Sequence, residues 1–189
     1  DPNAYGNTTN PVFYGTITYN HMGIKNHGIL AGISFRRDHI HDVLAGYGRD
    51  IEETYTDFGA FLQDEIELFN NKATLLLGLR GDKHSEISSI IVSPRASILY
   101  KGIKNLTVRT TFSTGFRAPQ VFDEDLHISM VGGDAMLIVK DPDLKEERSY
   151  SVTFGLDYGK QVVNKLYQFS IGGFYNHLNN VFTLREIDS

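Results

Sequence analysis

Several groups of residues carry side chains that could bind or catalyse. His39 and His41 alternate along an extended segment and could share a metal ion, but no third ligand is apparent, so we interpret them as part of a solvated loop. Glu65 and Glu67 share one face of a predicted strand, and paired carboxylates catalyse only where a pocket brings them together. Arg117 could hold a carboxylate or phosphate of a ligand, or tie the start of a loop to a neighbouring carbonyl or to Asp123 or Glu124.

An acidic run at Asp123, Glu124 and Asp125 could attract a cation, although such runs are usually solvated surface. The chain has no cysteine, no Gly-x-Ser-x-Gly elbow and no phosphate-binding loop. We therefore expect no catalytic residues, no bound metal and no enzymatic activity.

Composition narrows the class of protein. The 189 residues carry a net charge of -5 with no basic stripe, which argues against nucleic acid as a partner. No run of eighteen apolar residues exists, so a transmembrane helix is not predicted. A transmembrane barrel remains possible, because its strands alternate apolar and polar residues. Tyr and Phe are plentiful, at 10 and 12, while Trp is missing.

Alternation of apolar and polar residues predicts eight β-strands and no stable helix. Residues 1–11 are rich in turn formers and are predicted to end a loop, and residues 38–53 are predicted to form a longer polar loop. The sixth and seventh strands are joined by the long connection 115–146. The predicted strands are 12–21, 28–37, 54–69, 73–84, 92–100, 106–114, about 147–158 and 165–177.

Two strands show the alternation most clearly. In strand 73–84, Leu75, Leu77 and Leu79 share one face, opposite Arg80 and Asp82. The seventh strand carries an apolar row that is aromatic at both ends, as expected where a strand crosses two interfaces between water and lipid. That row is Tyr150, Val152, Phe154, Leu156 and Tyr158.

Connection lengths also alternate along the chain. Short links at 22–27, 70–72, 101–105 and 159–164 alternate with generally longer ones at 38–53, 85–91 and 115–146. This pattern is typical of an up-and-down barrel, which has brief turns at one end and extended loops at the other.

Two motifs carry a resemblance to a known family. Residues 115–119 read Gly-Phe-Arg-Ala-Pro at the entrance to the long connection, and residues 141–147 read Asp-Pro-Asp-Leu-Lys-Glu-Glu at its exit. With weaker fragments at 60–65, 77–80, 94–96 and 106–109, they resemble the TonB-dependent outer-membrane receptors. The resemblance implies an all-β, antiparallel up-and-down meander of about eight strands, a segment of a larger, roughly 22-stranded transmembrane β-barrel with a plug inside. It also implies import of a scarce nutrient across the outer membrane of a Gram-negative cell.

The resemblance covers only a middle part of such a barrel. No plug, TonB box or closing strand with a terminal aromatic residue is visible, so residues 1–189 are expected to be a partial receptor barrel domain. The implied partners are outer-membrane lipid, the TonB complex through the plug of the parent protein, and a small-molecule ligand.

The long connection is where ligand contacts are expected, and the resemblance points to Phe116, Arg117, Asp123 and His127. Haem receptors of this family carry a histidine between the two motifs, and His127 lies there. A neutral imidazole is a suitable axial ligand for haem iron. Against this, Asp141 replaces the asparagine of the family's second motif, and an ordinary loop histidine is the simpler interpretation. Haem or a ferric siderophore would in either case be cargo, not a resident cofactor.

Two alternatives stay open at the level of sequence. A small eight-stranded outer-membrane barrel could close on itself and serve a structural or adhesive role without active transport. A soluble sheet would have to bury its apolar strand faces by pairing with a second copy or by collapsing into a sandwich.

Overall fold

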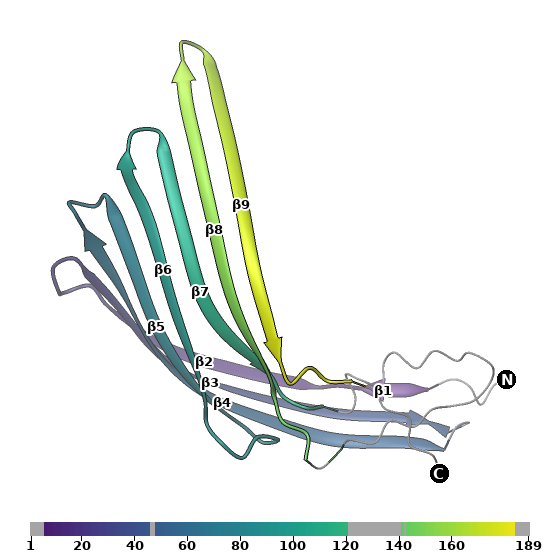
Figure 1. Cartoon of the computed structure of the whole chain (residues 1–189). Coiled ribbons are helices and arrows are strands. Elements are labelled where there is room, and N and C mark those ends of the chain that lie inside the picture. The colour runs from purple at the N-terminus through teal and green to yellow at the C-terminus, as the bar shows by residue number, and fades with distance from the viewer. Residues whose placement is uncertain (1–5, 46–47, 121–140, 142, 184–189) are drawn as a thin grey trace.

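The computed structural model describes residues 6–45, 48–120, 141 and 143–183. They form one nine-stranded antiparallel sheet in the order β1-β3-β4-β5-β6-β7-β8-β9, with β2 also paired to β3. Figure 1 shows an open, strongly curved sheet of neighbouring hairpins. The strands are β1 (Asn7–Thr9), β2 (Val12–His21), β3 (His27–Leu44), β4 (Arg49–Leu68), β5 (Ala73–His84), β6 (Ile91–Ile103), β7 (Leu106–Arg117), β8 (Glu147–Val162) and β9 (Lys165–Asn179).

The edge of the sheet begins earlier than the sequence predicted. Residues 7–9 were predicted to be loop, yet β1 pairs with the far end of β3, where Thr8 lies opposite Asp42. The strand is interrupted at Pro11, which has no N–H to donate but whose carbonyl accepts a hydrogen bond from the His39 N–H at 3.1 Å. β1 and β2 therefore act as one edge strand with a break, and an edge position is where proline is tolerated.

The predicted loop at 38–53 is wrong, because β3 and β4 continue through it and only 45–48 connects them. The pairing is unbroken, with His39 opposite Thr54 and His41 opposite Glu52. Polar and charged residues are frequent on both faces of this extension, so the apolar alternation that marks a half-buried strand is missing. Backbone hydrogen bonds extend the hairpin instead.

The predicted hairpin order is confirmed elsewhere. The short connections 22–26, 69–72, 104–105 and 163–164 gather at one end of the sheet, which we call the turn end (Figure 1). The opposite end carries 45–48, 85–90 and 118–146, and we call it the loop end. β6 contains a bulge between Tyr100 and Ile103 just before its turn.

The register assigns the two faces of the sheet. Leu77 lies opposite Ala96, and the same row continues through Phe112 and Val152 on β7 and β8. This apolar face is exposed: Leu79 and Phe154 keep 55% and 45% of their surface accessible. The predicted apolar rows, with Leu75, Leu77 and Leu79 on β5 and Phe154 and Leu156 on β8, share this face, and so does Tyr167 on β9. The opposite, polar face carries rows such as Gly78, Arg95, Ser113 and Ser151.

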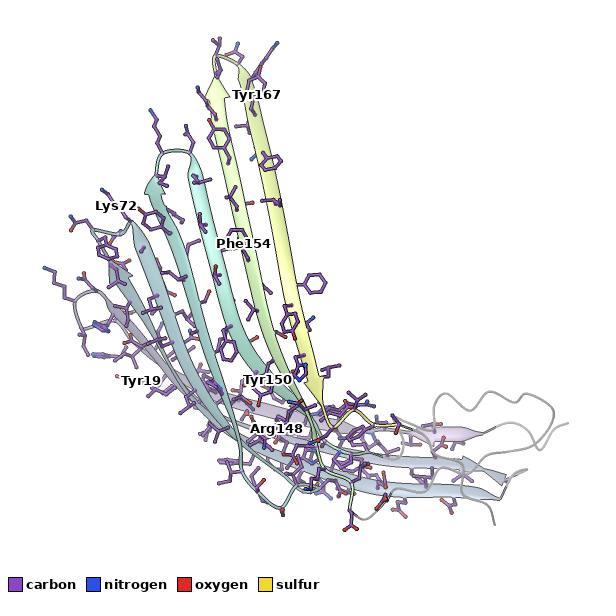
Figure 2. The ribbon with its side chains drawn as sticks, in the orientation of Figure 1. Tyr19, Lys72, Arg148, Tyr150, Phe154 and Tyr167 are labelled. Atoms are coloured by element: carbon purple, nitrogen blue, oxygen red, sulfur yellow. The ribbon has the colours of Figure 1, made fainter. Side chains whose placement is uncertain are left out.

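Aromatic residues mark the height of the apolar face. Tyr150 and Tyr158 share that face of β8, roughly 26 Å apart along the strand at about 3.3 Å per residue. The apolar band of a transmembrane barrel is about 25 Å tall with aromatic girdles at both edges. Figure 2 shows Tyr150 toward the loop end, Tyr167 at the turn end and Phe154 between them.

No described helix is long and apolar enough to cross a membrane.

Candidate functional site

Charged residues gather on the polar face where β3, β4 and β5 approach the loop end. Cross-strand register creates two rows: Ser34 lies beside Gly59 and Asp82, and Arg36 lies beside Asp57 and His84. Because every second residue of a strand points to the same side, alternate positions of three paired strands converge. We call this group the polar cluster: Ser34, Arg36, Asp38, Asp57, Arg80, Asp82 and His84.

Two arginines of the polar cluster are held by neighbouring acids. The Nε–H of Arg36 donates to Asp38 at 3.0 Å, and its Nη2 lies 2.7 Å from the other carboxylate oxygen. The Nε–H of Arg80 donates to Asp82 at 2.9 Å, and its Nη2–H donates to the hydroxyl of Ser34 at 2.9 Å. Such paired contacts fix a guanidinium in a defined plane.

Asp57 and His84, which we call the rim pair, lie opposite each other where β5 ends and β3 and β4 continue beyond it. The aromatic residues Phe35 and Phe58 are direct cross-strand partners and mark the edge of the apolar band, so the stretches from Phe58 to Leu68 and from Ala73 to Lys83 have the length of about 9–11 residues that a tilted strand needs to cross a bilayer. Asp57 and His84 therefore lie just beyond the membrane-spanning segments.

The protonation of this rim pair is shifted by its surroundings. Burial, and then the nearby Asp82 carboxylate, raise the pKa of Asp57 above its usual range. Oδ1 of Asp57 is buried without a hydrogen-bond partner. Burial lowers the pKa of His84, whose Nδ1 accepts a hydrogen bond from the Glu86 N–H at 3.1 Å and whose ring lies 6.0 Å from that of Tyr55. The pair therefore favours its less charged forms.

A cleft of about 170 Å³ opens over this rim pair. Its apolar wall is formed around Phe116, which packs against a small buried group of Ile87, Ile91 and Ala118. Polar and apolar groups thus meet at the loop end, as in small-molecule sites. The cleft is lined by Arg36, Asp38, Tyr55, Thr56, Asp57, His84, Phe116, Ala118 and Gln120.

The structure separates the residues predicted to contact ligand. Phe116 lines the cleft, whereas Arg117 does not. Arg117 lies at the end of β7, where its Nη1 is 3.6 Å from the Glu147 carboxylate and its guanidinium is 5.2 Å from the centre of the Phe182 ring. The carboxylate beside Arg117 is therefore that of Glu147, whereas the predicted tie was to a carbonyl, Asp123 or Glu124. Asp123 and His127 lie outside the described residues.

The start of β8, also at the loop end, is held by an ion pair. Arg148 donates from Nη2 to Glu146 at 2.7 Å (Figure 2 labels Arg148). Burial of the Glu146 carboxyl disfavours its ionisation, but the hydrogen bonds from Arg148 and from its own backbone outweigh that effect and lower its pKa. Glu146 thus remains ionised and anchors the start of β8.

Most residues of the cleft were missed by sequence reasoning. Asp38 was predicted to lie in a loop, and Arg36, Asp57 and His84 meet only through the pairing of three strands. One signal was present: the prediction that Arg80 and Asp82 face something polar is consistent with their place in the polar cluster.

The histidine pair of the β3 extension has separate partners. Nδ1 of His39 lies 2.9 Å from the Thr54 hydroxyl, and Nε2 of His41 lies 3.3 Å from Asp50. Within the described ranges, no three histidine or acidic side chains are grouped so that they could hold a metal ion.

Comparison with known proteins supports the fold. The chain is similar to the siderophore receptor PirA from Pseudomonas aeruginosa, with a TM-score of 0.71 and 16% identity over 92% of this chain and 32% of that one. It is similar to the copper transporter OprC, with a TM-score of 0.68 and 14% identity over 92% of this chain and 30% of that one. The chain is also similar to a double mutant of the hemophore receptor HasR from Serratia marcescens, solved with its hemophore HasA and heme. The TM-score is 0.67, and the identity is 14% over 93% of this chain and 34% of that one.

These identities are low enough that the structures establish the fold alone. The chain spans about a third of the length of these structures. A search of curated proteins found no match. A family model described as "TonB dependent receptor-like, beta-barrel" matches residues 1–189. The chain therefore belongs to the TonB-dependent receptor β-barrel family, whose members lie in the outer membrane.

Proposed function

We propose that the protein containing this chain imports a scarce nutrient, such as a ferric siderophore, haem or cobalamin, with energy delivered by TonB. It acts as a receptor and transporter, not as an enzyme. The observation that carries the proposal is the division of the sheet into an exposed apolar face and a polar face with paired charges and a cleft at the loop end. An apolar exterior suits lipid, and a charged interior suits a wet lumen filled by a plug.

The sheet forms one part of a barrel of about 22 strands in this proposal. Among the described strands, β9 and the β1–β2 edge each have only one neighbour. Unpaired edges are not tolerated in lipid, so further strands must continue the barrel on both sides. The plug, which would engage TonB, belongs to the rest of the parent protein. The alternative of a closed eight-stranded barrel would require these two edges to meet.

Ligand contact is assigned in this proposal to the loop end, where Phe116 presents its ring to the cleft and Arg117 lies on the neighbouring position of β7. Asp123 and His127 follow in the same connection. Arg117 already contacts Glu147, so an acidic ligand group would have to share or displace that carboxylate. If the cargo is haem, His127 is the candidate axial ligand.

The decisive experiment is an uptake assay with the full-length protein in cells that have or lack TonB. Labelled ferric siderophores, haemin and cobalamin are supplied separately as limiting nutrients. We expect accumulation of one of them only in cells that have both the receptor and TonB. Equal uptake without TonB, or no uptake of any compound on a broader panel, would count against active import.

Ligand residues are tested by binding to the same cells at low temperature, which separates binding from transport. Phe116→Ala, Arg117→Ala, Asp123→Ala and His127→Ala should each weaken binding of the imported compound, and Lys145→Ala on the same end of the sheet should not. For haemin, His127→Ala should also shift the absorption band of the bound iron porphyrin. Unchanged binding in all four variants would remove the site from the loop end without touching the transport proposal.

A further inference from the structure

Lysine is distributed unevenly over the two ends of the sheet. Six of the chain's nine lysines lie in or beside the four hairpin turns, and each of those turns has at least one. None of the described arginines lies there; they occupy the strands and the loop end. We call the six the turn-end lysines: Lys25, Lys72, Lys101, Lys104, Lys160 and Lys165.

The turn-end lysines are exposed and have no acidic partner among the described residues. All six side chains are exposed, and within the part of the chain that the structure describes none of them forms an ion pair. Lys83, near the loop end, is by contrast held by the carbonyls of the following loop, at 2.7 Å from that of Ser88. The turn end therefore carries positive charge that the described residues do not neutralise.

Tyrosines of the apolar face lie beside the turn-end lysines or a few residues before them along the strands. Lys160 is the cross-strand partner of Tyr167, and Tyr158 lies two positions before Lys160 on the same apolar face. Figure 2 shows Lys72 and Tyr167 at the turns of two separate hairpins. Tyr19 and Tyr100 lie a few residues from their own turns. All four tyrosines are exposed large aromatics.

This order, apolar face, then tyrosine, then lysine, follows the layers of a bilayer from hydrocarbon to headgroup. A tyrosine ring prefers the boundary, with its hydroxyl toward water. A lysine beside it can lay its methylene stem along the apolar surface and raise its ammonium group to the phosphate level. The acids closest to the turn end do not cancel this charge, because Glu65 and Glu67 lie on the polar face and Asp64 already contacts His27 at 2.7 Å.

We propose that the turn-end lysines form a docking surface for anionic phospholipid headgroups of the leaflet that surrounds the turn end. The ammonium groups pair with headgroup phosphates, and the tyrosines set their depth. Each lysine near an anionic surface strengthens binding about five-fold at moderate salt. The inference rests on the membrane location of the family and on the charge pattern; it does not depend on which nutrient is imported.

The test uses the full-length receptor, released in a mild detergent and mixed with phosphatidylglycerol or with phosphatidylethanolamine. Native mass spectrometry counts the lipids that remain bound. The test variant is Lys72→Gln/Lys104→Gln/Lys160→Gln/Lys165→Gln. A charge-reduced control at the other end is Arg37→Gln/Lys145→Gln, and the partner variant with arginine at the same four lysine positions keeps the charge. Heat-modifiable migration in electrophoresis confirms that each variant is folded.

Wild-type protein should retain phosphatidylglycerol in preference to phosphatidylethanolamine. The four-glutamine variant should lose that preference by tenfold or more, while the loop-end control and the arginine variant keep it. A preference that survives in the four-glutamine variant would overturn the proposal. So would an equal loss in the loop-end control, or a bound protein in place of lipid in the mass spectrum of the wild-type receptor. Nutrient uptake is measured in parallel, so failure here is separable from failure of the transport proposal.

Discussion

The guanidinium of Arg80 on β5 crosses the neighbouring strand β4 and donates a hydrogen bond to the hydroxyl of Ser34 on β3, at 2.9 Å. It can do so because Gly59 lies between them on β4, opposite both Ser34 and Asp82. A side chain at position 59 would enter the space that Arg80 and Asp82 occupy. One glycine thus lets three strands share a single polar contact.

We therefore expect Gly59→Ala to destabilise the receptor. Its Cβ would lie 2.6 Å from Oδ1 of Asp82 and 2.7 Å from Cζ of Arg80, so the buried acid or its partner must move. Asp82 is nearly inaccessible, and loosening its ion pair costs about 1–3 kcal/mol. The measurement is the thermal unfolding midpoint of the detergent-solubilised protein, followed by circular dichroism.

The matched control is Gly173→Ala on β9, where an added Cβ meets nothing within 4 Å. It should leave the midpoint unchanged. If both alanine variants behave alike, the close passage of Arg80 over Gly59 has no energetic role.

The two faces of β8 predict opposite responses to the same substitution. Phe154 belongs to the apolar face and Thr153 to the polar face. Phe154→Arg would place a charge in the middle of the apolar band, at a cost of about 2–4 kcal/mol, and should reduce the amount of folded protein in the outer membrane. Thr153→Arg would point into the polar face and should assemble normally. Quantitative immunoblotting of heat-modifiable protein in membrane fractions measures both.

Equal assembly of the two arginine variants would mean that the register of β8 is shifted by one residue, since such a slip exchanges the faces.

The faces of β5 and β8 could be predicted from sequence because a lipid-facing strand must show apolar residues at every second position. Leu75, Leu77 and Phe154 satisfy that rule without knowledge of their neighbours. The β3–β4 extension could not be predicted in the same way. His39 and His41 make one face polar there, and on the other face the buried Ile40 lies between the acids Asp38 and Asp42, so no regular apolar row marks the strand.

The candidate site was less accessible to sequence reasoning for a different reason. Phe116 was identified because it belongs to a motif, whereas Arg36, Asp57 and His84 are separated along the chain and meet only once three strands are paired. Which residues lie opposite each other depends on the register of the paired backbones, and no residue type predicts that register. Cross-strand neighbours are therefore the part of a barrel interior that needs a structure.

The hairpin between β8 and β9 contains a strained residue. Val163 adopts φ 54° in the two-residue turn and is 85% exposed, so its branched side chain gains little from packing while occupying the left-handed region. The two-residue turn between β6 and β7 has its left-handed residue at the second position, where Asn105, at φ 64°, tolerates this conformation. Val163→Asn should raise the free energy of unfolding by about 1 kcal/mol.

The check is the urea midpoint of folding into vesicles of zwitterionic phosphatidylcholine, which offer no net anionic surface to the turn-end lysines, compared with Lys104→Asn in the turn between β6 and β7. Lys104 is outside the left-handed region, so its replacement should change little. A lower midpoint for Val163→Asn would show that the valine side chain contributes a contact that outweighs its backbone strain.

His84 should titrate below the ordinary histidine pKa of about 6.5. Burial opposes its protonation most strongly; the carboxylates of Asp57, Glu86 and Asp38 favour it, and Arg36 opposes it. A histidine with a lowered pKa contributes stability that is complete above the ordinary value and is lost as the pH falls below it, because the unfolded chain then binds the proton more tightly. The loop-end rim should therefore loosen in mild acid.

The measurement is the imidazole titration of the receptor with isotope-labelled histidine, in which His84→Gln identifies the signal. Glu86→Gln removes a carboxylate that favours protonation and should lower the pKa of His84 further. A His84 signal that titrates above 6.5 would mean that the Asp57 carboxylate, not burial, governs this rim, and the cleft would then carry a charged pair at neutral pH.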